Sequence, residues 1–166
     1  MAGRTTFTTA FAFATAIVII MGSGAIERAE GRPVNLCSHT AYPSLCGPLV
    51  RRLVSPRQAT HHAIRLLESK TKSVLTQAAR YKSGNQAIAM CYETFSDALV
   101  NLQNARKSIK KRNVIAINAF LTAAVSDYGA CVDGFIETQQ VNTVQNAADM
   151  LRKMGTNCLS LSTLIR

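Results

Sequence analysis

The chain has 166 residues, of which 48% are hydrophobic, and 19 basic against 9 acidic residues give it a formal net charge of +10 at pH 7. This length and hydrophobic content suit a single domain with a core and argue against a disordered chain. Tryptophan is absent and aromatic residues make up only 6%, a composition that favours helices over strands. We therefore expect an all-α fold.

The N-terminus has the pattern of a secretory signal peptide. Arg4 precedes an apolar run at 11–21, and the small residues 23–25 follow it. The run is shorter than the roughly 20 residues that cross a membrane. We assign residues 1–25 to a signal peptide and 26–34 to a linker. The alternative, a buried N-terminal helix, is disfavoured because charged residues follow the run directly. No later stretch is comparably long and apolar, so the mature protein is expected to be secreted, without a membrane span.

The basic charge survives removal of the N-terminal segment. If cleavage falls near residue 31, the removed part carries two basic and two acidic residues, so the mature chain keeps 17 basic and 7 acidic residues and a net charge of +10. Such a charge raises the affinity for polyanions. Nucleic acid is not expected as a partner, because a secreted protein is separated from it. In addition, no helix carries a dense Lys/Arg run with interleaved aromatics. An anionic polysaccharide or an acidic protein surface fits better.

The first segment of the mature chain, residues 35–54, contains two closely spaced cysteines. Eight residues separate Cys37 from Cys46, and Pro43 bends the loop between them. We predict a local disulfide and a short helical hairpin that is clipped to itself. The alternative is a pair of free cysteines in a packed extension.

A long helix is expected to begin at Ser55 and Pro56, with Ser as the N-cap and Pro at the first helical position. It should end near Gly84, a residue that favours helix C-termini. Its predicted apolar face comprises Ala59, Ala63, Leu66, Leu67, Val74, Ala78 and Tyr81.

The next two helices form the most regular part of the sequence. Apolar residues recur at steps of three and four on both sides of the short turn 110–113, which predicts an antiparallel helical hairpin. The first seam is Ile88, Cys91, Phe95, Ala98, Leu102, Ala105 and Ile109; the second is Val114, Ile117, Leu121, Ala124, Tyr128, Cys131 and Phe135.

Cys91 and Cys131 lie at equal distances from Lys111, in the middle of the turn. Residues equidistant from the turn of an antiparallel pair share one level, so two seam cysteines there come within bonding distance. We predict a Cys91–Cys131 disulfide.

A last seam predicts a fourth long helix near the C-terminus. Its members are Val144, Ala147, Leu151, Met154, Cys158, Leu161 and Ile165. Short links between four helices require an antiparallel, up-down-up-down four-helix bundle over residues 55–166. Cys158 should be a buried free thiol that behaves as a small hydrophobe. The alternative is a reactive or intermolecular thiol.

Neither a metal site nor a cofactor site is expected. His61 and His62 are adjacent and point about 100° apart on a helix, so they do not form a chelating pair. The sequence contains neither a phosphate-binding loop nor a nucleophile elbow.

Acidic residues gather near the predicted inter-helix disulfide. Glu93, Asp97, Asp127 and Asp133 all lie within about two helical turns of Cys91 or Cys131. They could form a solvated face, a catalytic carboxylate pair or a surface that recognises another protein. The catalytic interpretation is disfavoured because a bundle filled by apolar seams leaves no substrate pocket, so we do not expect an enzyme.

At these positions the sequence resembles the plant invertase and pectin methylesterase inhibitor family, from Leu36 to the end of the chain. The matching motifs are Cys37 with Thr40, Tyr42, Pro43 and Cys46; Cys91-Tyr92-Glu93, Phe95, Asp97-Ala98-Leu99, Leu102 and Ala105; Ala123-Ala124, Ser126-Asp127, Cys131 and Asp133-Gly134-Phe135; and Cys158-Leu159. The resemblance implies a disulfide-stabilised four-helix bundle with an N-terminal helical hairpin. It also implies disulfides from first to second and from third to fourth cysteine, with the fifth unpaired.

Members of that family are not enzymes but bind secreted carbohydrate-active enzymes in the cell wall, so the resemblance implies an apoplastic inhibitor domain at 35–166. In the pectin methylesterase branch the bundle lies across the enzyme's substrate cleft. Glu93, Asp97 and Asp133 match acidic positions of that surface, whereas Val100 and Ala130 replace Asp and Thr that such inhibitors can carry.

The predicted target is pectin methylesterase, because the Pro-Lys-Phe motif of the invertase-inhibitor branch is missing and residues 111–114 read Lys-Arg-Asn-Val instead. An inhibitor of cell-wall or vacuolar invertase is the alternative. A basic wall protein that holds anionic pectin is a further one. Plant pectin methylesterases also carry such a domain as a pro-region, but since no catalytic domain follows it here, an independent inhibitor is expected.

Overall fold

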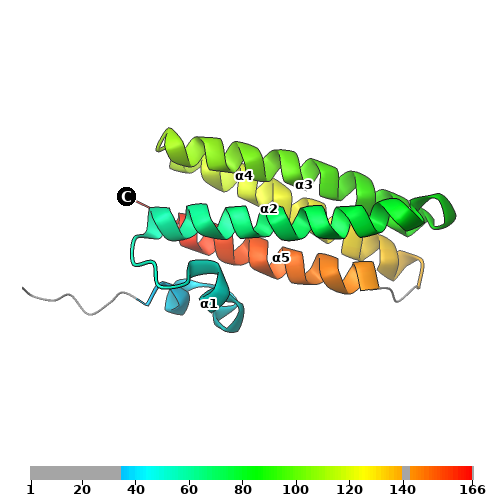
Figure 1. Cartoon of the computed structure of the whole chain (residues 1–166), viewed down its shortest axis with the longest axis horizontal. Coiled ribbons are helices and arrows are strands. Elements are labelled where there is room, and N and C mark those ends of the chain that lie inside the picture. Colours follow the sequence, from blue (N-terminus) through cyan, green and yellow to red (C-terminus); the bar gives the residue numbers. More distant parts are fainter. Residues whose placement is uncertain (1–34, 140–142, 166) are drawn as a thin grey trace, which may run out of the picture. The chain divides into compact units, whose positions relative to one another are not determined.

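The computed structural model describes residues 35–139 and 143–165. Its elements, in chain order, are a 3-10 turn η1 (Leu36–His39), α1 (Pro43–Val50), α2 (Pro56–Tyr81), a second 3-10 turn η2 (Lys82–Gly84), α3 (Gln86–Lys110), α4 (Val114–Glu137) and α5 (Thr143–Ser162) (Figure 1). Every regular element in the described ranges is helical, which confirms the all-α prediction. The expected signal peptide and linker lie outside these ranges.

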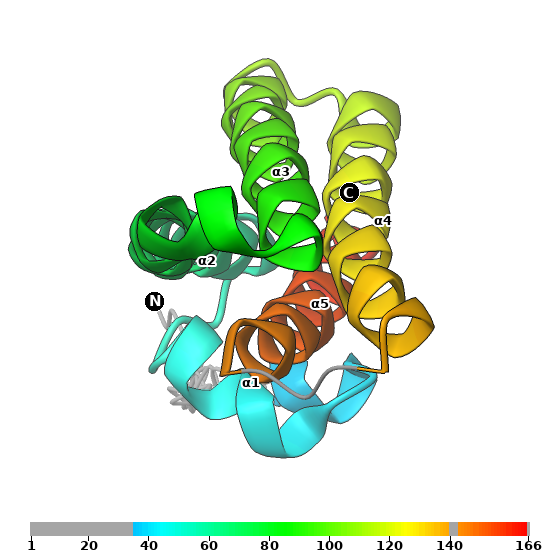
Figure 2. The same cartoon turned by 90° about the vertical axis from the view of Figure 1, so that its right-hand side faces the viewer.

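The four long helices form the predicted antiparallel bundle. α3 packs against α2 and α4, and α5 packs against α4 and α2, so each long helix has two main neighbours (Figure 2). Residues 111–113 are all that separates α3 from α4. α1 packs against α2 and α5, so the N-terminal segment covers one side of the bundle.

The predicted seams form most of the core. All seven residues of the α3 seam are buried, and so are those of the α4 seam except the partly exposed Val114. The prediction for α2 was wrong at Tyr81, which is 62% exposed. Tyr81 is the last residue of α2, so its side chain leaves the helix at the end of the bundle, where there is little core to cover it. Ile64, which was not part of the predicted apolar face, is buried.

Three polar residues begin the long helices. Asn85 accepts a hydrogen bond from the Ile88 amide at 3.0 Å, and Asn113 accepts one from the Ala116 amide at 3.0 Å. These are N-caps, which stabilise a helix by satisfying an amide that has no partner in the first turn. Ser55 stands at the predicted N-cap of α2, but its side chain makes no capping bond there.

Two disulfides tie the chain together at the pairs that the sequence predicts. Cys37–Cys46 joins η1 to α1, and Cys91–Cys131 joins α3 to α4, with Cα atoms 4.6 Å apart in the second pair. Cys158 is a buried free cysteine on α5, where desolvation raises the pKa of its thiol to about 12. It therefore stays a neutral thiol at ordinary pH.

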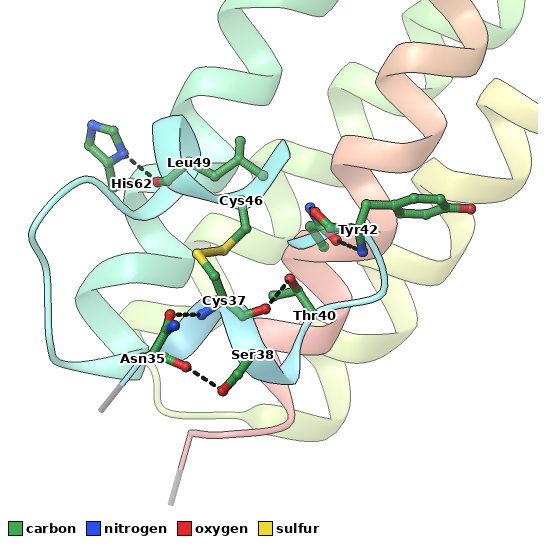
Figure 3. Close-up of a disulfide and its surroundings, with 9 residues drawn as sticks. Asn35, Cys37, Ser38, Thr40, Tyr42, Cys46, Leu49 and His62 are labelled. Atoms are coloured by element: carbon green, nitrogen blue, oxygen red, sulfur yellow. Dashed lines mark hydrogen bonds between the residues drawn. A yellow bond between two sulfur atoms is a disulfide. The ribbon is translucent and has the colours of Figure 1, made fainter. Parts of the chain in front are cut away.

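The N-terminal extension is held to the bundle by polar contacts as well as by packing (Figure 3). The side-chain amide of the buried Asn157 on α5 accepts a hydrogen bond from the Tyr42 amide and donates one to the Tyr42 carbonyl, both at 2.8 Å. On the other side, Nδ1 of His62 on α2 lies 2.8 Å from the Leu49 carbonyl oxygen. Both ends of α1 are thus attached to the bundle.

Candidate functional site

The part of the bundle around Cys91 and Cys131 is rigidly built. Both cysteines are fully buried, and the rings of Phe95 and Tyr128 meet about one turn away with centroids 6.1 Å apart. The Tyr128 hydroxyl lies 2.6 Å from the Thr71 hydroxyl, so α4 is also tied to α2. Burial raises the pKa of Tyr128, and the phenol therefore stays neutral and hydrogen-bonded. The helix backbones that carry the exposed side chains are therefore held in place relative to one another.

On the outer side of α3, four exposed residues follow one another at steps of three and four. We call Met90, Glu93, Asp97 and Val100 the α3 stripe; Met90 is 38% and Val100 56% exposed. This spacing places them on one side of the helix. Met90 also packs closely over Gly134 of α4, where any side chain would collide with its Cε atom.

Asp127 lies next to the α3 stripe, in the interface between α3 and α4. Its Oδ2 accepts a hydrogen bond from the Asn101 side chain at 2.9 Å. Burial raises the pKa of Asp127, the Asn101 hydrogen bond lowers it, and the nearby charge of Asp97 raises it again. Asp97 and Asp127 therefore belong to one acidic surface that spans the two helices.

Asp133 lies on a different side of α4. The pKa of Arg152, on α5, is raised mainly by its hydrogen bond to Asp149, and the charge of Asp133 adds a smaller contribution. Asp133 thus faces the α5 side of the bundle, although it is exposed like Glu93 and Asp97. The structure brings Asp97 and Asp127 together, with Glu93 one turn away from Asp97 on the α3 stripe, and sets Asp133 towards α5.

The acidic side chains line none of five surface hollows on the described part of the chain. Within the same residues, no group of three or more His, Cys, Asp and Glu side chains could hold a metal ion. Carboxylates beside exposed apolar side chains, on a rigid support, are features of a surface that another protein contacts.

Helix α4 is unusually apolar for a helix at the surface of a bundle. It is the described helix that is long and apolar enough to cross a membrane by length and composition, with a mean hydropathy of 1.4, a property that we did not expect from the sequence. Small residues such as Ala119 and Ala130 contribute to this value on the exposed side. Its seam packs against α3 and α5, so α4 acts here as a bundle helix.

Comparisons with known proteins agree with this architecture. The model of the family described as plant invertase/pectin methylesterase inhibitor matches residues 33–161. Pectinesterase inhibitor 6 of Arabidopsis thaliana is 29% identical over 110 residues, which are 61% of this chain and 49% of that protein. The chain therefore spans about half the length of that curated relative.

Two solved structures share the fold. A crystal structure of mutant form A of a pectin methylesterase inhibitor from Arabidopsis superposes with a TM-score of 0.71 and 17% identity, covering 79% of this chain and 95% of that one. A second, of a pectin methylesterase inhibitor from Arabidopsis thaliana, gives a TM-score of 0.63 and 17% identity, covering 83% and 98%. At this identity the two structures establish the fold. The family model, which matches most of the chain, shows that the chain belongs to the plant invertase/pectin methylesterase inhibitor family.

Proposed function

We propose that this protein is a secreted inhibitor of pectin methylesterase, and that it covers the substrate cleft of the enzyme with the α3 stripe and Asp127. The observation that carries this proposal is the exposed acidic surface directly beside the Cys91–Cys131 disulfide. Family membership supports an inhibitor role. The curated relative is a pectinesterase inhibitor and the two similar structures are of pectin methylesterase inhibitors, which favours pectin methylesterase over invertase as the target.

The mechanism is occlusion by a stoichiometric complex, without a chemical step. A protein that fills a cleft excludes the substrate, and its affinity depends on how little the contact surface must reorganise on binding. The disulfide and the Phe95–Tyr128 contact hold α3 and α4 in place before the partner arrives. Carboxylates at Glu93, Asp97 and Asp127 then provide orientation and specificity towards a basic cleft rim.

Asp133, which the sequence predicted as part of the enzyme-binding surface, contributes less in this proposal. Because it faces the α5 side, it contacts the enzyme only if the complex extends around α4. We place it at the edge of the interface, where a charge affects the association rate more than the affinity.

The domain division follows from the same proposal. Residues 1–25 would direct secretion to the apoplast, 26–34 would link the signal to the domain, and 35–166 would form the inhibitor as a hairpin (35–54) and a bundle (55–166). Sequencing the N-terminus of protein secreted by plant cells tests the division. A mature chain that begins well inside 35–54 would contradict it.

The target is tested by titrating the purified mature protein into assays of several pectin methylesterase isoforms and of a cell-wall and a vacuolar invertase. We expect dose-dependent loss of pectin methylesterase activity that saturates near one inhibitor per enzyme. Inhibition of invertase alone would overturn the proposed target and leave the inhibitor role. Inhibition of neither would overturn both.

The surface is tested with a neutralised variant and a matched control. Glu93→Gln with Asp97→Asn removes two negative charges from the α3 stripe, and we expect about tenfold weaker inhibition, or about 1.4 kcal/mol. Ser73→Lys with Gln77→Lys changes the net charge equally at exposed positions of α2 and should leave inhibition within about twofold. Equal effects from the two variants would show that only net charge matters.

A further inference from the structure

The opposite end of the bundle carries a basic groove that the inhibitor surface does not use. This groove lies between the beginning of α2 and the end of α3, and its volume is about 450 Å³. Arg57, His61 and Lys110 contribute to its walls, and the partly exposed Leu53 adds apolar surface. None of its lining residues is acidic.

More positive charge surrounds the groove. The pKa of His61 is lowered first by burial and then by the charges of Arg65, Arg106, Lys110 and His62. These cations therefore act on the same place. Lys111 and Arg112, in the turn after Lys110, and Arg51 and Arg52, just before Leu53, are exposed and extend the basic region along the chain.

One acidic side chain offsets part of this charge. Glu68 on α2 is 6% exposed, and its Oε1 lies 3.2 Å from Nε of Arg106, without the geometry of a hydrogen bond. Glu68 is the only acidic residue between positions 35 and 92, and none occurs between 98 and 126. The groove thus keeps a large excess of positive charge.

Parts of the groove are held in place before any ligand binds. Nη2 of Arg57 donates a hydrogen bond to the Ile109 carbonyl at 3.1 Å and so joins the beginning of α2 to the last turn of α3. The His62 ring is fixed against the Leu49 carbonyl. The guanidinium of Arg57 has further N–H groups for an anion, because it carries five donors. A preorganised site loses less entropy on binding.

We propose that this groove binds a polyuronate, a chain of uronic acid residues with free carboxylates. The inference rests on the proposed function, because removal of methyl esters from pectin produces such a chain. Arginine and lysine pair well with carboxylates, and the partly exposed Leu53 offers apolar surface to the face of a sugar ring. A fully esterified pectin has no carboxylates and would lack these contacts. The inhibitor would therefore be held where the enzyme has already acted.

The groove and the α3 stripe lie at opposite ends of the bundle. The groove includes the end of α3, whereas the α3 stripe lies in its first half. One inhibitor can therefore hold the polysaccharide and the enzyme at the same time.

The test is binding of the full mature chain to immobilised polygalacturonate. We expect retention that weakens as the salt concentration rises from about 50 to 300 mM, because ion pairs at an exposed groove are screened. Fully methyl-esterified pectin should retain little protein. Equal retention on both polymers, or tighter binding to an oligonucleotide of equal charge, would overturn the proposal.

Two matched variants locate the site. Arg65→Glu with Lys110→Glu reverses two exposed charges beside the groove, and we expect binding to weaken by about tenfold or more. Lys70→Glu with Arg80→Glu makes the same change in net charge at exposed positions of α2 outside the groove, and the loss should be about threefold or less. Similar losses from both variants would overturn the assignment. Thermal unfolding of each variant verifies that it is folded.

The same variants separate this proposal from the proposed function. With a short, fully esterified substrate, the groove variant should inhibit pectin methylesterase as well as the original chain does. If the original chain inhibits no pectin methylesterase but still binds polygalacturonate through the groove, the proposed function fails and the site stands. If inhibition is normal and groove-dependent binding is absent, the proposed function stands and the polyuronate site fails.

Discussion

The two ends of the bundle hold their charges in different ways. At the α3 stripe, the acidic side chains stand on helices joined by a disulfide, and Asp127 is fixed by Asn101. At the groove, the basic side chains surround an open hollow beside a short turn, and among the described residues Glu68 is the one acidic side chain that forms an ion pair in this region. A few fixed charges favour recognition of one protein surface, whereas many loosely compensated charges favour a flexible polyanion. The comparison is the basis for the two proposals, which place the enzyme at one end and the polysaccharide at the other.

The largest effect is expected from removal of the disulfide at the acidic end. Cys91→Ala with Cys131→Ala opens a loop with a sequence separation of 40, and we expect the free energy of unfolding to fall by about 4 kcal/mol. Inhibition should weaken even at temperatures where the variant is folded, because α3 and α4 lose their fixed spacing. Urea denaturation and inhibition assays measure the two effects.

The second disulfide provides the control. Cys37→Ala with Cys46→Ala opens a separation of only 9, so the loss should be smaller, about 2.5 kcal/mol on the same entropy model. Inhibition by folded protein should be retained. If this variant lost more inhibition than the first, the N-terminal extension would belong to the enzyme-binding surface.

A polar contact outside both ends gives the next largest effect. Asn157→Ala removes both hydrogen bonds to the Tyr42 backbone and leaves buried polar groups without partners, which should cost about 2 kcal/mol. Amide exchange at 40–46 should accelerate, while inhibition and polygalacturonate binding stay unchanged. Asn157→Asp keeps an acceptor for the Tyr42 amide. Its stability should differ from that of the Ala variant mainly because of the added charge. Unchanged amide exchange at 40–46 in the Ala variant would show that Asn157 does not hold the N-terminal extension to the bundle.

Charge at the C-terminal end of the α3 stripe is a finer test. Val100 is 56% exposed, and Val100→Asp adds a carboxylate beside Asp97; we expect up to about threefold stronger inhibition. Ile115→Asp, at a position that is 84% exposed near the groove end of α4, is the control and should not strengthen it. Weaker inhibition by the Val100 variant would show that this residue makes an apolar contact.

The smallest effect concerns Asp127 and depends on pH. Burial raises its pKa in the folded protein above the ordinary value of 3.8, so folding favours the protonated form. The resulting stabilisation is complete below the ordinary pKa and is lost as the pH rises through the folded value. Asp127→Asn should therefore raise stability at pH 7, by about 0.5 kcal/mol or less, and should not raise it at pH 3. Thermal unfolding at both pH values measures this, and a gain at pH 3 would contradict it.

Local patterns in the sequence predicted the bundle well. The two seams on either side of the turn 110–113 have helical spacing and end at a short link, so the α3–α4 hairpin and the level of Cys91 and Cys131 follow from counting residues. The prediction that Tyr81 is buried was wrong because the apolar periodicity continues to the end of the helix, whereas the core that covers the helix ends earlier.

Contacts between distant residues were beyond such patterns. Asn157 and Tyr42 are 115 positions apart, and no local signal links an amide on one helix to a backbone bend elsewhere. Asp133 could have been separated from Asp127, because six residues on a helix turn a side chain about 120° away. The groove is formed by three segments: the link at Leu53, the beginning of α2 and the end of α3. The sequence showed that the chain is basic, but not that these segments meet.

Amide exchange of the inhibitor with and without pectin methylesterase is the most direct test of the central claim. We expect the enzyme to protect α3 around Met90–Val100 and the facing part of α4 around Asp127, and to leave the groove residues around His61 and Lys110 unprotected. Protection at the groove end with none at the α3 stripe would contradict the account.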